Sequence, residues 1–355
     1  MSTHQKPGRL RRRLSWIFGS LVALILVAVS ATWWVARDQI ETALQRTQAD
    51  LAADGVTLDY SALGFSGFPL QMEAKLERPT LTWPDGSWQG PPAVSGAAWL
   101  TDPLSLAFSA PGDGRLRIGP QDLTIDSGQA DAQVRIGDQG LDTVAVLLGN
   151  ARIALPQGDE VLGLGTAEAA VAPVRPLRSA TESSSFTLLL RDLRLPAAAA
   201  SGLGADLQSL DLAGRISGPL FPGAGPVMAR IWQEGGGSLA LERLDIVWGA
   251  LRMEASGLLG LDQALRPQGS LNLEVADPDA LLKALERSGQ LQPGLAERYS
   301  GLLAGLARPR DGLSGRWVAI PLELRDGRAF LDLPIPFVPD IELARLPPLF
   351  PSQSF

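Results

Sequence analysis

Apolar and polar residues alternate along most of the chain after residue 56. Such alternation places the apolar side chains on one face of a strand and the polar ones on the other, which is typical of antiparallel sheets. The clearest alternating runs are Leu70–Leu76, Leu104–Phe108, Phe186–Leu190, Leu239–Leu241, Leu244–Trp248, Leu271–Val275 and Val318–Leu324. The pattern predicts a mainly β protein with a large antiparallel, meandering sheet.

Turn signals separate these runs at intervals typical of hairpins. Examples are Asp85-Gly86, Asp113-Gly114 and Asp326-Gly327. The Pro- and Ser-rich stretch 173–185 interrupts the alternation, so we interpret it as a linker between two β segments.

Two stretches have helical periodicity instead. Residues 37–55 place Ile40, Leu44 and Leu51 on one helix face, which predicts a juxtamembrane stalk. Residues 277–306 predict a small cap of two helices, the first beginning with Asp277 as N-cap and Pro278 at the first helical position.

Residues 14–36 form an uncharged run of 23 residues, which as a helix spans about 34 Å. Basic residues precede the run and tryptophans lie near both of its ends, which predicts a transmembrane anchor with a cytoplasmic N-terminus and a periplasmic body. The anchor residues are Arg11, Arg12, Arg13, Trp16, Trp33 and Trp34. The alternative is a cleavable signal peptide, for which Ala28-Val29-Ser30 supplies small residues.

These patterns together predict a domain organisation. It consists of a basic cytoplasmic tail (1–13), the anchor (14–36), a juxtamembrane helix (37–55), a first β segment (56–172), a linker (173–185), a second β segment (186–276), a helical cap (277–306), a β hairpin (307–334) and a Pro-rich extended tail (335–355).

Composition excludes several kinds of catalytic site. The chain has no cysteine and its single histidine is His4, so triads and pairs that need either residue are ruled out, as are multi-histidine or thiolate metal sites. Of the 31 basic and 38 acidic residues, five basic and no acidic ones precede residue 36. The remaining body therefore has a formal charge of −12, which argues against nucleic acid as a partner. No pattern indicates a cofactor.

The predicted helices are too few to cover the apolar face of so large a sheet, and a face of that kind must be covered. Either the sheet closes into a sandwich or barrel with a dry core, or it curls into an open trough whose apolar lining accepts lipid. The candidate lining residues are Leu70, Met72, Leu76, Leu104, Leu106, Phe108, Leu239, Leu241, Ile246, Leu271 and Leu273.

Three short segments of the sequence resemble those of a known family. Gly67-Phe68-Pro69 precedes an alternating strand, Gly235-Gly236-Gly237 begins the run to Trp248-Gly249, and Leu322 to Gly327 ends the regular part. Together they resemble the domain-of-unknown-function 2125 family of proteobacterial envelope proteins. That family is similar to the AsmA-like group, whose larger members have long β-grooves implicated in phospholipid movement. The resemblance implies an envelope location and lipid handling, and it implies no catalytic residue.

We therefore expect a single-pass inner-membrane protein with a periplasmic β body that binds or shuttles phospholipid without catalysis. One alternative is a scaffold that binds another envelope protein. The other is a glycan hydrolase, which would require two opposed carboxylates about 5–9 Å apart in a cleft. The chain is short compared with the larger AsmA-like proteins, so we do not expect it to bridge two membranes alone.

Overall fold

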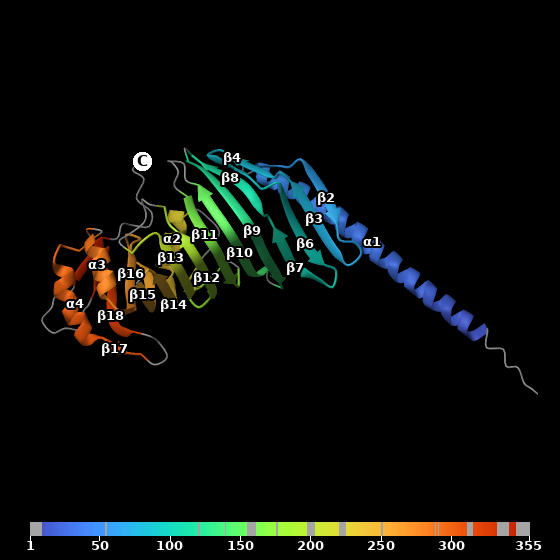
Figure 1. Cartoon of the computed structure of the whole chain (residues 1–355). Helices are drawn as coiled ribbons and strands as arrows, with labels where there is room; N and C mark the ends of the chain where they lie inside the picture. Colours follow the sequence, from blue (N-terminus) through green and yellow to red (C-terminus); the bar gives the residue numbers. More distant parts are fainter. Residues whose placement is uncertain are drawn as a thin grey trace, which may run out of the picture.

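The computed structural model shows one long helix, one open sheet and three short helices (Figure 1). It describes residues 9–53, 55–119, 121–138, 140–154, 161–174, 177–196, 203–219, 225–249, 251–287, 289, 291–310, 315–331 and 341–345. For residues 9–29, 121, 161, 225, 226, 285, 302, 331 and 341–345 it describes the backbone only.

All twenty strands belong to a single antiparallel sheet, and its pairings do not close into a barrel. The main run of neighbours is β9 (Gln121–Gly137), β10 (Gly140–Ala154), β11 (Val161–Ala172), β12 (Ser183–Arg194), β13 (Asp206–Ser217), β14 (Ser238–Trp248), β15 (Leu251–Leu261), β16 (Pro267–Ala276), β18 (Arg316–Arg325), β19 (Arg328–Leu331) and β20 (Ile341–Arg345). The short strand β17 (Arg308–Pro309) pairs with the start of β18. The sandwich and the closed barrel, which the sequence left open, are therefore both wrong.

The sheet divides into two branches at β9, the longest strand. The first part of β9 pairs with β8 (Gly112–Ile118), which continues to β5 (Gly86–Gln89), β4 (Thr80–Trp83) and β1 (Thr57–Asp59). The last part pairs with β7 (Asp102–Ser109), which continues to β6 (Ala93–Trp99), β3 (Gln71–Glu77) and β2 (Ala62–Ser66). A strand of 17 residues is long enough to hold two partners end to end on one edge.

Helix α1 (Arg9–Ala53) is continuous over the predicted anchor and stalk. Its second half lies against the two branches, where the Gln48 side chain donates to the Leu58 carbonyl at 2.9 Å. Within the part of the chain that the structure describes, no helix combines the length and apolar character of a membrane span. The side chains of Arg11, Arg12, Arg13 and Trp16 lie outside the described residues.

Several predicted boundaries need correction. Strands β11 and β12 pair directly from Gly163–Arg194 to Ala172–Ser185, so the stretch 173–185 contains a loop between neighbouring strands rather than a break in the sheet. The Pro-rich tail contains β20, which pairs with β19. The predicted cap and hairpin are present as α3 (Asp279–Arg287), α4 (Leu295–Leu306) and the β18–β19 pair.

A further helix, α2 (Gly225–Glu234), was not predicted. It packs Trp232 against Leu261 and Leu265 and, on the sheet, against Ile216 and Leu239. The Trp232 Nε1 donates to the Ser217 carbonyl at 2.8 Å, which fixes the helix over the end of β13. The spacing of Met228 and Trp232 was the available signal, and the surrounding glycines and prolines obscured it.

Candidate functional site

One face of the sheet is apolar across thirteen strands, and we call it the apolar face. Residues directly opposite each other in paired strands share a face, so the pairings define rows that cross the sheet. The central row is Phe65, Ala74, Gly96, Phe108, Ala132, Val146, Ala169, Leu188, Leu212, Leu244, Ala255, Leu273 and Ile320. At about 4.8 Å between strands, this row is roughly 58 Å long without a polar side chain.

Two further apolar rows flank the central one. The first contains Met72, Ala98, Leu106, Val134, Val144, Val171, Phe186, Gly214, Leu241, Gly257, Leu271 and Leu322. The second contains Ala130, Leu148, Ala167, Leu190, Leu210, Ile246, Met253, Val275 and Val318. The structure thus brings the candidate residues Met72, Leu106, Phe108, Leu241, Ile246, Leu271 and Leu273 onto one face.

The remaining candidates lie beside these rows. Leu76 and Leu239 alternate with Met72 and Leu241 on the same face, and Leu104 precedes Leu106 by two positions in β7. Leu70 lies in the turn between β2 and β3. The sequence reasoning did not single out Val146 and Val171, because small residues on both sides of β10 and β11 hide the alternation there.

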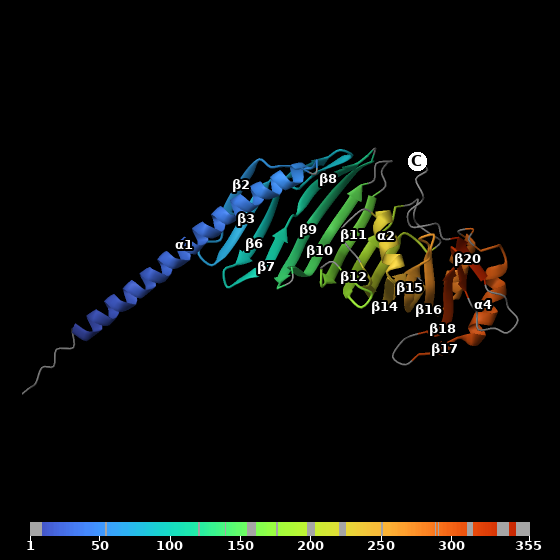
Figure 2. The same ribbon diagram turned by 180° about the vertical axis from the view of Figure 1, so that it is seen from behind.

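Helices cover both ends of the apolar face. At one end α1 brings the Arg37 guanidinium 5.1 Å from the centre of the Phe65 ring, and Met72 is only 4% exposed. At the other end Leu282, Ala296 and Leu303 of α3 and α4 pack on Val318 and Ile320. Helix α2 lies on the same side of the sheet as α1, as Figure 2 shows.

The centre of the apolar face is open among the described residues. Leu104, Phe108, Val146 and Val171 are between 38 and 52% exposed, and they belong to β7, β10 and β11. Phe108 and Val146 lie on either side of Ala132, so the exposed side chains are close neighbours. Contiguous apolar patches on soluble proteins mark binding surfaces when they exceed a few hundred Å².

The opposite face of the sheet is polar and carries a row of carboxylates. The row is Ser109, Asp131, Leu147, Glu168, Leu189, Asp211, Asp245, Glu254 and Glu274. Arg243 binds Asp211 at 3.0 Å, and Arg310 binds Glu254 at 2.6 Å and Glu274 at 2.7 Å. Burial, followed by the charges of Glu254 and Asp211, raises the pKa of Asp245. Hydrogen bonding to Glu254 raises the pKa of Arg310.

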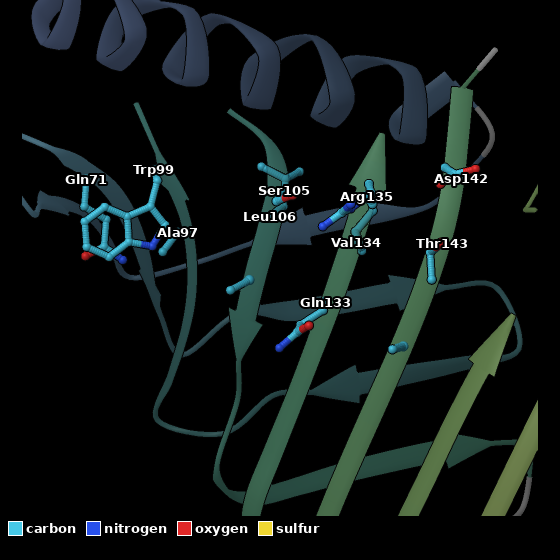
Figure 3. A pocket seen from close by; sticks show the side chains of 12 residues that line it. Gln71, Ala97, Trp99, Ser105, Leu106, Gln133, Val134, Arg135, Asp142 and Thr143 are labelled. Carbon is cyan, nitrogen blue, oxygen red and sulfur yellow. The ribbon is translucent and has the colours of Figure 1, made fainter. Parts of the chain in front are cut away.

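The hollows of the sheet also lie on this polar face. One of 380 Å³ is lined by residues of β3, β6, β7, β9 and β10, including Gln133, Arg135 and Trp99 (Figure 3). A second, of 640 Å³, lies over the carboxylate row at Asp131 and Glu168. Among the described residues no group of three or more histidine, cysteine or acidic side chains is arranged to hold a metal ion. Polar and apolar side chains together line these hollows, for example Gln133 beside Val134 in the first and Asp131 beside Leu147 in the second.

A comparison of the whole chain with known protein families decides the family. Residues 33–339 match the family described as an uncharacterized protein conserved in bacteria (DUF2125). The chain belongs to the DUF2125 family. No curated protein and no solved structure is similar to it. The matched region includes all the apolar rows, so the apolar face of this DUF2125 protein lies within the family's shared region.

Proposed function

We propose that this DUF2125 protein is a non-catalytic lipid-binding protein of the cell envelope. Residues 14–36 would anchor it in the inner membrane with the sheet in the periplasm. The apolar face would hold the acyl chains of phospholipids. The observation that carries the proposal is the uncovered centre of the apolar face, with Phe108, Val146 and Val171 exposed between covered ends.

The dimensions of the open centre suit an acyl chain. From β7 through β9, β10 and β11 to β12 there are four inter-strand steps, or about 19 Å. One leaflet of a bilayer has a hydrocarbon thickness of about 15 Å. Each methylene group that is fully buried contributes about 0.8 kcal/mol, so a chain lying along the rows would gain substantial free energy without any specific polar contact.

The polar face supports a non-catalytic role. Four of the described carboxylates in its row form an ion pair with an arginine or accept a hydrogen bond from a polar side chain. They are Asp131, Asp211, Glu254 and Glu274. The proposed kinship with the AsmA-like group rests on the same architecture, a long open sheet with one apolar face.

Native mass spectrometry of the full chain in detergent tests the proposal. Val146→Lys places a charge on the exposed part of the apolar face, whereas the matched control Leu147→Lys places it on the polar face between Asp131 and Glu168. We expect phospholipid to stay bound to the natural chain and to Leu147→Lys and to be lost from Val146→Lys. Equal phospholipid on all three, or none on any, would contradict lipid binding by this face; none on any would favour the protein-binding scaffold.

A further inference from the structure

Exposed aromatic and aliphatic side chains gather at the end of the sheet where α1 reaches it. Trp34, Val35, Phe68, Leu70 and Trp99 are all between 53 and 64% exposed. Single exposed apolar residues are common on proteins, but a group of five that includes three aromatic rings is a patch. We call these five residues the apolar tip.

Three segments are tied together to form the apolar tip. The Trp33 and Phe68 rings meet edge to face with their centres 6.0 Å apart, and the Trp33 Nε1 donates to the Gln71 carbonyl at 3.4 Å. The Leu100 amide donates to the Leu70 carbonyl at 2.9 Å, so the β6–β7 turn lies against the β2–β3 turn. The patch is thus held by contacts within the described chain.

The continuity of α1 sets the depth of the tip relative to a membrane. Residues 14–36 are uncharged, and Trp33 and Trp34 belong to the last turn of that stretch in the same unbroken helix. If this stretch spans the bilayer, Trp33 lies at the membrane surface, and Phe68 must lie there too because it contacts Trp33. The interface is where tryptophan and other amphipathic rings are most favourable.

The nearest charge on α1 follows immediately. The Arg37 guanidinium lies 5.6 Å from the Trp34 ring centre and 5.1 Å from that of Phe65, and it pairs with Glu41 at 3.2 Å. Arg37 therefore lies next to the tip and beside Phe65, the first residue of the central apolar row. A cation just outside the apolar residues suits the phosphate level of a bilayer.

We infer that the apolar tip is embedded in the membrane interface, so that the β2–β3 and β6–β7 turns form a second membrane contact beside the anchor. This inference rests on the proposed anchoring of residues 14–36. It places the first strands of the apolar face at the lipid surface, with the sheet extending away from it (Figure 1).

Depth-dependent fluorescence quenching of the full chain tests this contact. The chain has no cysteine, so Phe68→Cys and Leu70→Cys each give one labelling position for an environment-sensitive fluorophore. Ile118→Cys is the matched control, because Ile118 is 51% exposed but lies near the opposite end of β9, about 46 Å along the strand from the β7 end. The proteins are incorporated in phosphatidylcholine vesicles with and without brominated acyl chains.

Probes at positions 68 and 70 should be quenched several-fold by brominated lipid, and the probe at 118 should be unaffected. Flotation of the same samples reports on the anchor separately. A chain that floats with the vesicles while the probes at 68 and 70 remain unquenched would overturn the inference and leave the anchor intact. A chain that does not float would overturn both.

Discussion

Leu207 and Leu210 are three positions apart in β13, yet they face the same side of the sheet. Leu210 is opposite Ile246 and Leu207 is opposite Trp248, and these two β14 residues share a face because they are two positions apart. An extra residue in β13, Gln208, makes this possible. Under strict alternation, residues three positions apart face opposite sides, so Leu207 would point to the polar face if Gln208 were an ordinary strand residue.

The same irregularity crosses five strands. The pairings leave out Gly128, Asn150, Gly165, Asp192 and Gln208, one residue on each strand from β9 to β13, between pairs that are in register on both sides. Asn150 and Asp192 have left-handed backbone conformations, with φ of 51° and 53°. The row keeps Ala151, Leu164 and Leu193 on the apolar face although strict alternation would turn them away.

The left-handed conformation of Asp192 gives a first prediction. Asp192 is exposed, so its replacement acts mainly through the backbone. Asp192→Val should lower the free energy of unfolding by about 1–3 kcal/mol, because β-branched residues are strained at positive φ. Asp192→Gly should change it by less than about 1 kcal/mol. Urea unfolding of both variants checks this, and equal stabilities would show that the left-handed conformation is not required.

The lowered pKa of Asp262 predicts a contribution to stability that is lost in acid. Burial alone would raise its pKa, but hydrogen bonds from the Arg266 amide and guanidinium and from the Ala264 amide outweigh burial and lower it. A lowered folded-state pKa gives stability that is present above the unfolded value of about 3.9 and lost as the pH falls through the folded value.

Asp262→Asn should therefore be less stable than the natural chain at pH 7, by about 1–2 kcal/mol. The difference should shrink as the pH falls below about 4. Urea unfolding at pH 7, 5 and 3.5 provides the measurement. A difference that is independent of pH would mean that the ionised carboxylate is not what stabilises the β15–β16 turn.

The raised pKa of Asp245 predicts the opposite pH dependence of stability. Its raised pKa means that the folded chain favours the protonated form, so its stabilising contribution is full below about 3.9 and is lost as the pH rises through the folded value. Asp245→Asn, which is uncharged at every pH, should unfold at higher urea concentration than the natural chain at pH 7 and at the same concentration near pH 3.5.

A surface carboxylate provides the control for Asp245. Asp206 forms a 3.9 Å pair with Arg194 in which both side chains are more than 70% exposed. Exposed ion pairs of this kind contribute little to stability. Asp206→Asn should therefore hardly change the urea concentration at which the chain unfolds at either pH. Asp245 also lies 3.7 Å from the Arg243 guanidinium. If Asp245→Asn destabilises the chain at pH 7, this contact matters more than the burial of Asp245 beside Glu254 and Asp211.

The local alternation of the sequence predicted the strands and much of the apolar face, because a period of two decides which side chains share a face. Met72, Leu106, Leu241 and Leu273 illustrate this. Alternation within one strand cannot show which strands are neighbours. The division at β9 and the direct pairing of β11 with β12 depend on contacts between distant segments, and the sequence therefore missed them.

The aligned irregularities were equally hidden. Asn150 and Asp192 each interrupt one strand, and only the pairing of the strands reveals that they lie in one row with Gly165 between them. The exposed residue Val146 was missed for a related reason. Whether it is covered depends on where α1 and α2 lie, and the periodicity of one strand does not show this.

Photo-crosslinking in cells tests the central claim, lipid contact at the apolar face, most directly. A benzophenone amino acid is placed in the full chain at position 108 or at position 107. Phe108 and Ala107 are adjacent, both exposed, and on opposite faces of β7, so the pair is internally matched. We predict that irradiation attaches phospholipid at position 108 and not at 107. Phospholipid at neither position or equally at both, or a protein partner alone at 108, would contradict the account.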